Sequence, residues 1–80
     1  MEKSEFNIQF GKFVAEKRRS MNWPQVELAS RMNNNFQNIS RLERGEISPT
    51  FYWIFQLSSV FEIKCSKFIE EFESKLEKTK

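Results

Sequence analysis

Apolar residues recur along most of the chain at spacings of three and four, the period of helices that bury one face. The pattern predicts a first helix over about residues 7–21, preceded by a loose lead-in over residues 1–6. It predicts two later helices over about 51–60 and 65–78, and two shorter ones between 24 and 45. The expected fold class is therefore all-α, with five helices.

The segment over residues 24–45 predicts two short helices joined by a tight turn at Asn33-Asn34-Asn35. Asparagine tolerates the left-handed conformation that ends one helix, and it caps the start of the next. The second helix, over about residues 36–44, turns Ile39 and Leu42 inward, and a glycine ends it. The apolar set expected on the first helix is Val26, Leu28, Ala29 and Met32. Such a pair is a helix-turn-helix unit, whose second helix can lie in the DNA major groove.

Two blocks of residues carry a resemblance to a known family. Residues 25–29, Gln-Val-Glu-Leu-Ala, are similar to the Q-x-E-L-A start of the helix-turn-helix in the XRE family, the phage Cro/cI repressor-like regulators. Residues 39–45, Ile-Ser-Arg-Leu-Glu-Arg-Gly, resemble that family's I-S-x-I-E-x-G ending, at matching spacing. The resemblance covers about residues 6–72. It implies one five-helix DNA-binding domain over residues 1–80, with a helix-turn-helix core at 24–45.

Three positions depart from the family pattern. Pro24 stands where a Ser or Thr cap is usual, and proline is accepted in the first turn of a helix. Asn33 replaces the usual glycine, and asparagine is the next best residue for a left-handed backbone. Asn34 replaces an apolar residue. That change is expected to remove a buried contact beneath the second helix of the unit.

Composition excludes several classes of protein. The chain has no His, one Cys and two Gly, so it offers no catalytic triad, zinc site, internal disulfide or phosphate-binding glycine loop. No enzyme activity, metal or cofactor is expected. No apolar run is long enough to span a membrane, and the N-terminus is too polar for a signal peptide, so a bacterial or phage-encoded cytoplasmic protein is expected. The net charge of +2 is weak evidence for nucleic acid, so the DNA hypothesis depends on the motif.

The candidate DNA contacts gather around the second helix of the unit. Gln37 and Arg41 are expected to be the main base readers, because they are four residues apart and share one helix face. Phe36 has two readings: it packs beside Ile39 and replaces volume lost at Asn34, or it touches a thymine methyl group. The full set of candidates is Gln25, Asn35, Phe36, Gln37, Ser40, Arg41 and Arg44.

Some of these residues keep a second reading. Asn35 is expected to cap the helix and touch the DNA backbone. Gln25 either caps its own helix locally or contacts a phosphate. The basic residues of the first helix are either a solvated face or phosphate contacts; they are Lys12, Arg18 and Arg19.

Two further expectations concern structure and assembly. The resemblance implies an ion pair between Arg18 and Glu43, because the family carries an Arg and a Glu at these places. The last helix, over residues 65–78, carries an apolar stripe that continues almost to the chain end. Long uncovered stripes mark interfaces, so a homodimer is expected through Phe68, Phe72 and Leu76.

The sequence therefore predicts a transcriptional regulator that binds a palindromic operator in double-stranded DNA as a homodimer. The resemblance suggests a restriction-modification controller, a phage or mobile-element repressor, or an antitoxin. The alternative is a protein-interaction module, in which the last helix binds a partner protein and DNA binding is weak.

Overall fold

The computed structural model describes residues 1–78, and its described part contains five α-helices and no strand. The helices are α1 (Lys3–Ser20), α2 (Gln25–Arg31), α3 (Phe36–Glu43), α4 (Phe51–Val60) and α5 (Cys65–Lys78). The expected all-α fold class is confirmed. No helix in this part of the chain is both long enough and apolar enough to cross a membrane.

The first helix begins earlier than the sequence pattern indicated. The predicted loose lead-in over residues 1–6 is wrong, because α1 already begins at Lys3. The reason is tertiary: the ring of Phe6 lies 5.4 Å from that of Phe72 on α5, in an edge-to-face arrangement. Packing of this kind outweighs the fraying expected at a chain end.

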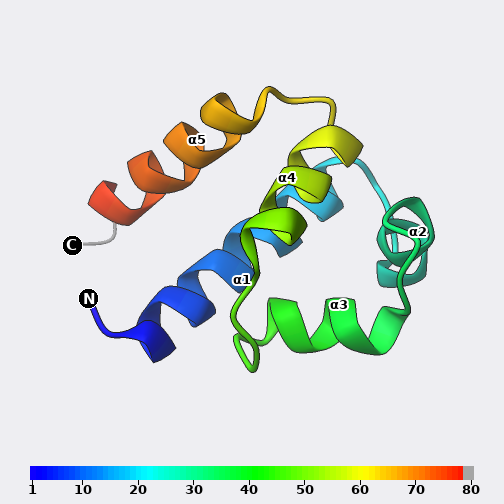
Figure 1. Ribbon diagram of the computed structural model, residues 1–80, viewed down its shortest axis with the longest axis horizontal. Coiled ribbons are helices and arrows are strands. Elements are labelled where there is room, and N and C mark those ends of the chain that lie inside the picture. The colour runs from blue at the N-terminus through cyan, green and yellow to red at the C-terminus, as the bar shows by residue number, and fades with distance from the viewer. Residues whose placement is uncertain (79–80) are drawn as a thin grey trace.

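Helix α1 is the central element of the fold. It packs against α3 on one side and against α5 on the other, while α2 packs on α3 and α4 packs on α5. Figure 1 shows α2 and α3 at one end of the molecule, and the start of the chain near the last turn of α5 at the other. The helix-turn-helix pair is therefore displayed on a scaffold made by α1, α4 and α5.

An aromatic cluster joins α1 to α5. Phe10 lies 5.2 Å from Phe72, and Phe13 lies 5.1 Å from Phe68, measured between ring centroids. Phe68 and Phe72 are 0% and 5% exposed in the single chain. The prediction that these two residues form a dimer interface is therefore wrong, because α1 already covers them. Leu76 is partly buried against the same core.

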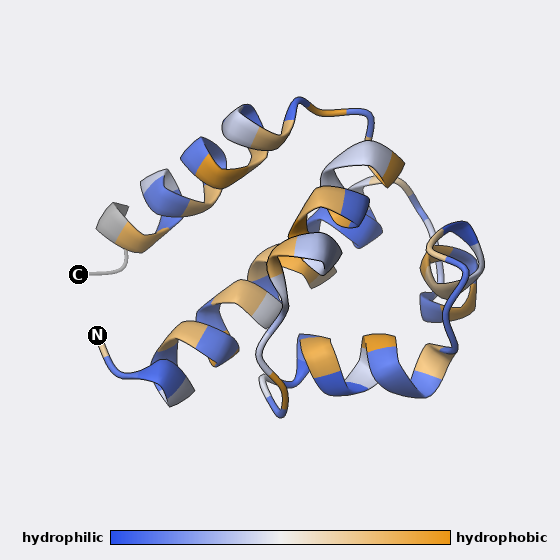
Figure 2. Cartoon of the chain, in the orientation of Figure 1, coloured by the Kyte–Doolittle hydropathy of each residue, from blue (hydrophilic) through white to orange (hydrophobic). Residues whose placement is uncertain are grey.

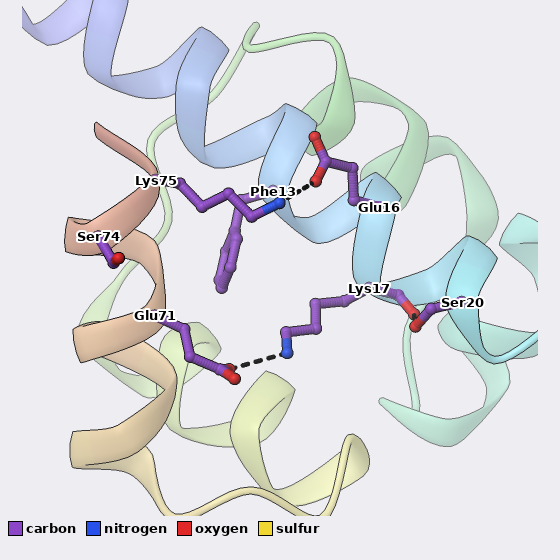
Figure 3. Close-up of a pocket in the computed structure, with 7 residues that line it drawn as sticks. All are labelled: Phe13, Glu16, Lys17, Ser20, Glu71, Ser74 and Lys75. Atoms are coloured by element: carbon purple, nitrogen blue, oxygen red, sulfur yellow. Dashed lines mark hydrogen bonds and ion pairs between the residues drawn. The ribbon is translucent and has the colours of Figure 1, made fainter. Parts of the chain in front are cut away.

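Two ion pairs cross the rim of the same α1–α5 contact. Lys75 Nζ lies 2.7 Å from Glu16 Oε2, and Lys17 Nζ lies 2.8 Å from Glu71 Oε2, with Phe13 drawn between the two pairs (Figure 3). The Lys17 approach lacks hydrogen-bond geometry. The Lys75–Glu16 pair is exposed and contributes only about 0–1 kcal/mol. The aromatic packing beneath it therefore contributes more to the contact between α1 and α5 than this pair does.

Two glycines allow α1 to approach the end of α3. A Cβ atom at Gly11 would lie 2.5 Å from the carbonyl oxygens of both Leu42 and Glu43, so only glycine fits there without a backbone shift. Gly45 has φ +77°, and a Cβ there would meet Ile8 at 2.8 Å. The close contact between α1 and α3 places the C-terminal end of α3 against the middle of α1.

Trp23 ties the turn between α1 and α2 to the end of α4. Its ring stacks on that of Phe61 at 5.8 Å, and the guanidinium of Arg31 lies 4.1 Å above it. The ring is partly buried and packs against the core. This contact holds the start of α2 in place relative to the scaffold.

Candidate nucleic-acid interface

Helix α3 has one buried face and one exposed face. Ile39 and Leu42 are both 0% exposed and seat the helix on the core. Successive residues of an α-helix are about 100° apart, so positions 37, 41 and 44 lie on the opposite side. Gln37 and Arg41 are exposed there, as predicted from their four-residue spacing. Figure 2 shows hydrophobic and hydrophilic residues alternating along α3, in contrast to the mainly hydrophobic α4.

The turn before α3 is built from the three asparagines. Asn33 has φ +53°, the left-handed conformation expected for it. Asn35 is the N-cap of α3, and its Oδ1 accepts a hydrogen bond of 2.9 Å from the backbone N–H of Asn38. The predicted cap is therefore formed.

Asn34 replaces an apolar contact with hydrogen bonds. Its Oδ1 accepts from the backbone N–H of Asn35 at 2.8 Å and from the side chain of Asn38 at 2.9 Å. A polar residue is tolerated where its hydrogen-bonding groups find partners. The start of α3 is thus fixed by amide groups in place of the expected apolar side chain.

The C-terminal end of α3 is held by a buried ion pair, as the family resemblance implied. Arg18 Nε donates to Glu43 Oε2 at 2.7 Å, and its Nη2 donates to Oε1 at 2.9 Å, a two-pronged geometry. The side chains are 10% and 6% exposed. Arg18 also donates to the backbone carbonyl of Trp23 at 2.8 Å. The hydrogen bonds that Arg18 donates to Glu43 raise the pKa of Arg18 above its ordinary value.

Gln25 belongs to the same network. Its side-chain amide donates to Glu43 Oε1 at 3.0 Å, which joins the first residue of α2 to the end of α3. The residue is partly buried, so a purely local capping role does not describe it. A primary amide has two N–H groups, and this bond uses one of them. The network therefore sets both the position of the side chain and the angle between the two helices.

An acidic residue that the sequence reading missed lies beside the arginines of α3. Glu46 Oε2 lies 2.6 Å from Arg44 Nε, and Glu46 Oε1 lies 3.9 Å from Arg41 Nε. Arg44 also donates to the hydroxyl of Ser40. Hydrogen bonding to Arg44 lowers the pKa of Glu46. The only signal in the sequence was the two-residue spacing between Arg44 and Glu46, which a turn can bring together.

A groove beside this end of α3 is lined by both basic and acidic residues. The exposed side chains of Lys12, Arg19 and Arg44 lie there, together with Gln25 and the acidic Glu16 and Glu43. Arg18, the third basic residue of the α1 set, is buried with Glu43 and does not belong to the exposed surface. Phosphate contact by the basic residues of α1 is therefore open only to Lys12 and Arg19.

Comparison with known proteins identifies the family of this chain. A family model described as helix-turn-helix matches residues 14–68, which is more than half of the chain. The chain belongs to the XRE family of helix-turn-helix proteins. It is a DNA-binding regulator of transcription. No curated protein sequence gives a significant match.

A solved structure shares the fold of this XRE-family chain. It is the restriction-modification controller protein C.AhdI from Aeromonas hydrophila, with a TM-score of 0.77 and 19% sequence identity. The similarity covers 85% of this chain and 99% of that one. At this level of identity the likeness establishes the fold.

Two apolar residues of this XRE-family chain lie on the surface of the helix-turn-helix. Phe36 is 47% exposed, so it does not fill the core beneath α3. Val26, which belongs to the apolar set expected on α2, is 57% exposed and does not share the buried side of that helix. The helical period gives the reason: Val26 is about 160° from Leu28 around the helix, whereas Ala29 and Met32 share the buried side with Leu28.

Proposed function

We propose that this XRE-family regulator reads a palindromic operator as a homodimer, with α3 in the major groove of each half-site. The proposal is supported by the outward face of α3, where Gln37 and Arg41 are exposed opposite the buried Ile39 and Leu42. The major groove distinguishes all four base pairs, and a helix fits within it. The buried network of Arg18, Glu43 and Gln25 would hold α3 at a constant angle during this contact.

Gln37 and Arg41 are the proposed base readers. Glutamine bonds adenine through two atoms, and arginine bonds guanine in the same way. Gln37 lies in the first turn of α3, the part of a recognition helix that meets base edges. Arg41 is one turn further along and long enough to reach the next base pair or a phosphate.

Residues around this face are proposed to position the protein on the DNA backbone. Lys12, Arg19 and Arg44 line one groove, and such side chains contact phosphates without reading sequence. The second N–H of the Gln25 side-chain amide is proposed to donate to a phosphate. Asn35, at the start of α3, and Ser40, next to Arg44, are proposed to contact the DNA backbone as well. Each neutralised phosphate lowers the log–log salt slope by about 0.9.

The test begins with operators selected from a random DNA pool, followed by binding at several salt concentrations. A salt slope of about −3 or steeper per half-site supports phosphate contact by the groove residues. Gln37→Ala and Arg41→Ala should each lose about 1–3 kcal/mol at one base position and relax the preference there. Lys12→Ala is the matched control, because a phosphate contact weakens all sequences alike. Unchanged base preference in both α3 variants would refute the assignment.

The dimer surface is proposed to lie on α4. Phe51, Tyr52 and Phe55 are 69%, 65% and 52% exposed, and α4 carries no charged residue. Exposed aromatic groups of this kind mark interaction surfaces. In a two-fold dimer each patch meets its own copy, so an uncharged patch is self-complementary where a charged one would repel itself.

The size of the patch indicates a weak dimer. A buried aromatic side chain covers about 150–250 Å², and these three are 69%, 65% and 52% exposed, so together they offer about 300–450 Å² per protomer for burial. A standard interface needs about 800 Å² per partner. Dimerisation is thus expected in the micromolar range or above, and binding to two linked half-sites would reinforce it.

Analytical ultracentrifugation tests the surface. The native chain should dimerise at tens of micromolar, and Tyr52→Lys should stay monomeric because two like charges would meet across the two-fold axis. Met21→Lys is the control, since Met21 is an exposed apolar residue (40%) at the end of α1. A native chain that is strictly monomeric both free and on selected DNA would refute the homodimer.

The exposed α4 patch also supports the second candidate, a module that binds a different protein. That reading predicts a native monomer together with a salt slope near zero on duplex DNA. The two measurements above therefore separate the candidates.

Among the suggested biological roles, the fold of C.AhdI favours restriction-modification control, and location of the selected operator upstream of nuclease and methyltransferase genes would support it.

A further inference from the structure

The helix-turn-helix presents an apolar pair where most of its surface is polar. Val26 on α2 and Phe36 on α3 are 57% and 47% exposed. Both line a single groove between the two helices, along with Ala29. The other lining residues are polar: Ser30, Asn33, Asn34 and Asn35. Neither Val26 nor Phe36 is among the residues that form the core or pack against it.

The position of Phe36 follows from its neighbours. It is the first residue of α3, about 60° from Ile39 around the helix and about 120° from Leu42, so its ring stands beside the buried stripe. Asn34 stands where the family has an apolar residue, and its side-chain oxygen accepts hydrogen bonds from Asn35 and Asn38. The ring is therefore left on the same end of α3 as Gln37, the end that a recognition helix turns toward base edges.

We propose that Phe36, supported by Val26, reads the C5-methyl group of a pyrimidine in the major groove. Among the four DNA bases only thymine carries this methyl group there, and apolar side chains recognise it by contact. The C5-methyl group of 5-methylcytosine occupies the same place on its ring. The inference rests on the proposed function, because it requires α3 to lie in the major groove next to the base that Gln37 reads.

The first arm of the test replaces thymines of the selected operator, one at a time, with deoxyuridine. This change removes the methyl group and leaves every hydrogen-bonding group of the base pair in place. The native chain should lose about three- to tenfold in affinity at one thymine per half-site. Phe36→Ala should bind the thymine operator as weakly as the native chain binds the deoxyuridine operator, and should show no further loss on the latter.

The second arm separates thymine from methylated cytosine. The responsive T·A pair is replaced by C·G with and without a methyl group at C5 of the cytosine. If methylation restores affinity for the native chain but not for Phe36→Ala, the site accepts 5-methylcytosine as well as thymine. If only the thymine operator responds, the methyl reading is confined to thymine, and the proposal stands in that narrower form.

Control variants keep the result interpretable. Phe36→Leu retains an apolar side chain and should keep most of the discrimination, whereas Met21→Ala removes an exposed apolar residue outside the groove and should change nothing. Because Phe36 is half exposed, the thermal midpoint of Phe36→Ala should stay close to that of the native chain. A native chain that binds its operator through Gln37 and Arg41 but ignores every deoxyuridine replacement would overturn this inference alone. Failure to select any operator would instead overturn the proposed function.

Discussion

Replacing Glu43 with alanine tests whether the buried ion pair holds α3 on α1. The change leaves the Arg18 guanidinium without the two oxygens that lie 2.7 and 2.9 Å from it, in a site where its side chain is only 10% exposed. Removing one partner of a buried pair costs about 3–5 kcal/mol, because the remaining charge is left uncompensated. An 80-residue domain has about 4–12 kcal/mol of total stability, so the loss would be a large fraction of it.

The free energy of unfolding is measured by urea titration, and the midpoint temperature by calorimetry. We expect Glu43→Ala to lower the midpoint by about 12 °C or more, at about 4 °C or more per kcal/mol for a domain of this size. The matched control is Glu27→Ala, which breaks the exposed Glu27–Arg31 pair on α2, where the side chains are 42% and 47% exposed. That pair is worth about 0.3–0.5 kcal/mol.

A double-mutant cycle separates the pair from general disruption. Arg18→Ala and the double variant Arg18→Ala/Glu43→Ala complete the cycle, and the double variant should be more stable than the sum of the two single losses predicts. The reasoning would be refuted if Glu43→Ala unfolded within about 0.5 kcal/mol of the native chain. Strict additivity across the cycle would refute it as well.

Three further predictions follow from named contacts. Gly11→Ala should cost about 1–3 kcal/mol in urea titration, because its Cβ would press on the carbonyls at the end of α3, whereas the exposed Ser20→Ala should be neutral. Asn35→Ala should cost about 1 kcal/mol by loss of the N-cap, and Asn35→Ser should retain most of it. Glu46→Gln should tighten DNA binding about fivefold by releasing the α3 arginines, and equal affinity of the two proteins near pH 7 would contradict this.

The acidic side chain also sets a pH dependence. Arg44 holds the pKa of Glu46 below its ordinary value of 4.5, so the carboxylate stays charged at neutral pH. A lowered pKa in the folded chain means that the pair contributes to stability above the ordinary pKa and loses that contribution as the pH falls through the folded value. The affinity difference between the native chain and Glu46→Gln should therefore persist from pH 7 to pH 5 and shrink only in more acidic solution.

Local chemistry was sufficient to predict most of the helices. The spacing of Ile39 and Leu42 predicted the buried face of α3, and Asn33 and Asn35 predicted the turn and the cap, because these effects depend on a residue and its near neighbours. The ends of α4 and α5 followed from the same kind of signal. The family resemblance added the Arg18–Glu43 pair, which is 25 positions apart along the chain and has no local signature.

Tertiary packing decided what the periodic pattern could not. The stripe of Phe68 and Phe72 looks the same in sequence whether it faces a second copy or α1, and only the position of α1 shows that it belongs to the core. The same packing drew Phe6 into a helix. From the sequence, Asn34 was expected to remove a buried apolar contact. In the structure its side chain makes hydrogen bonds in place of that contact, and Phe36 stays on the surface. Periodicity thus determines which face of a helix is apolar, whereas the arrangement of the other helices determines whether that face is covered.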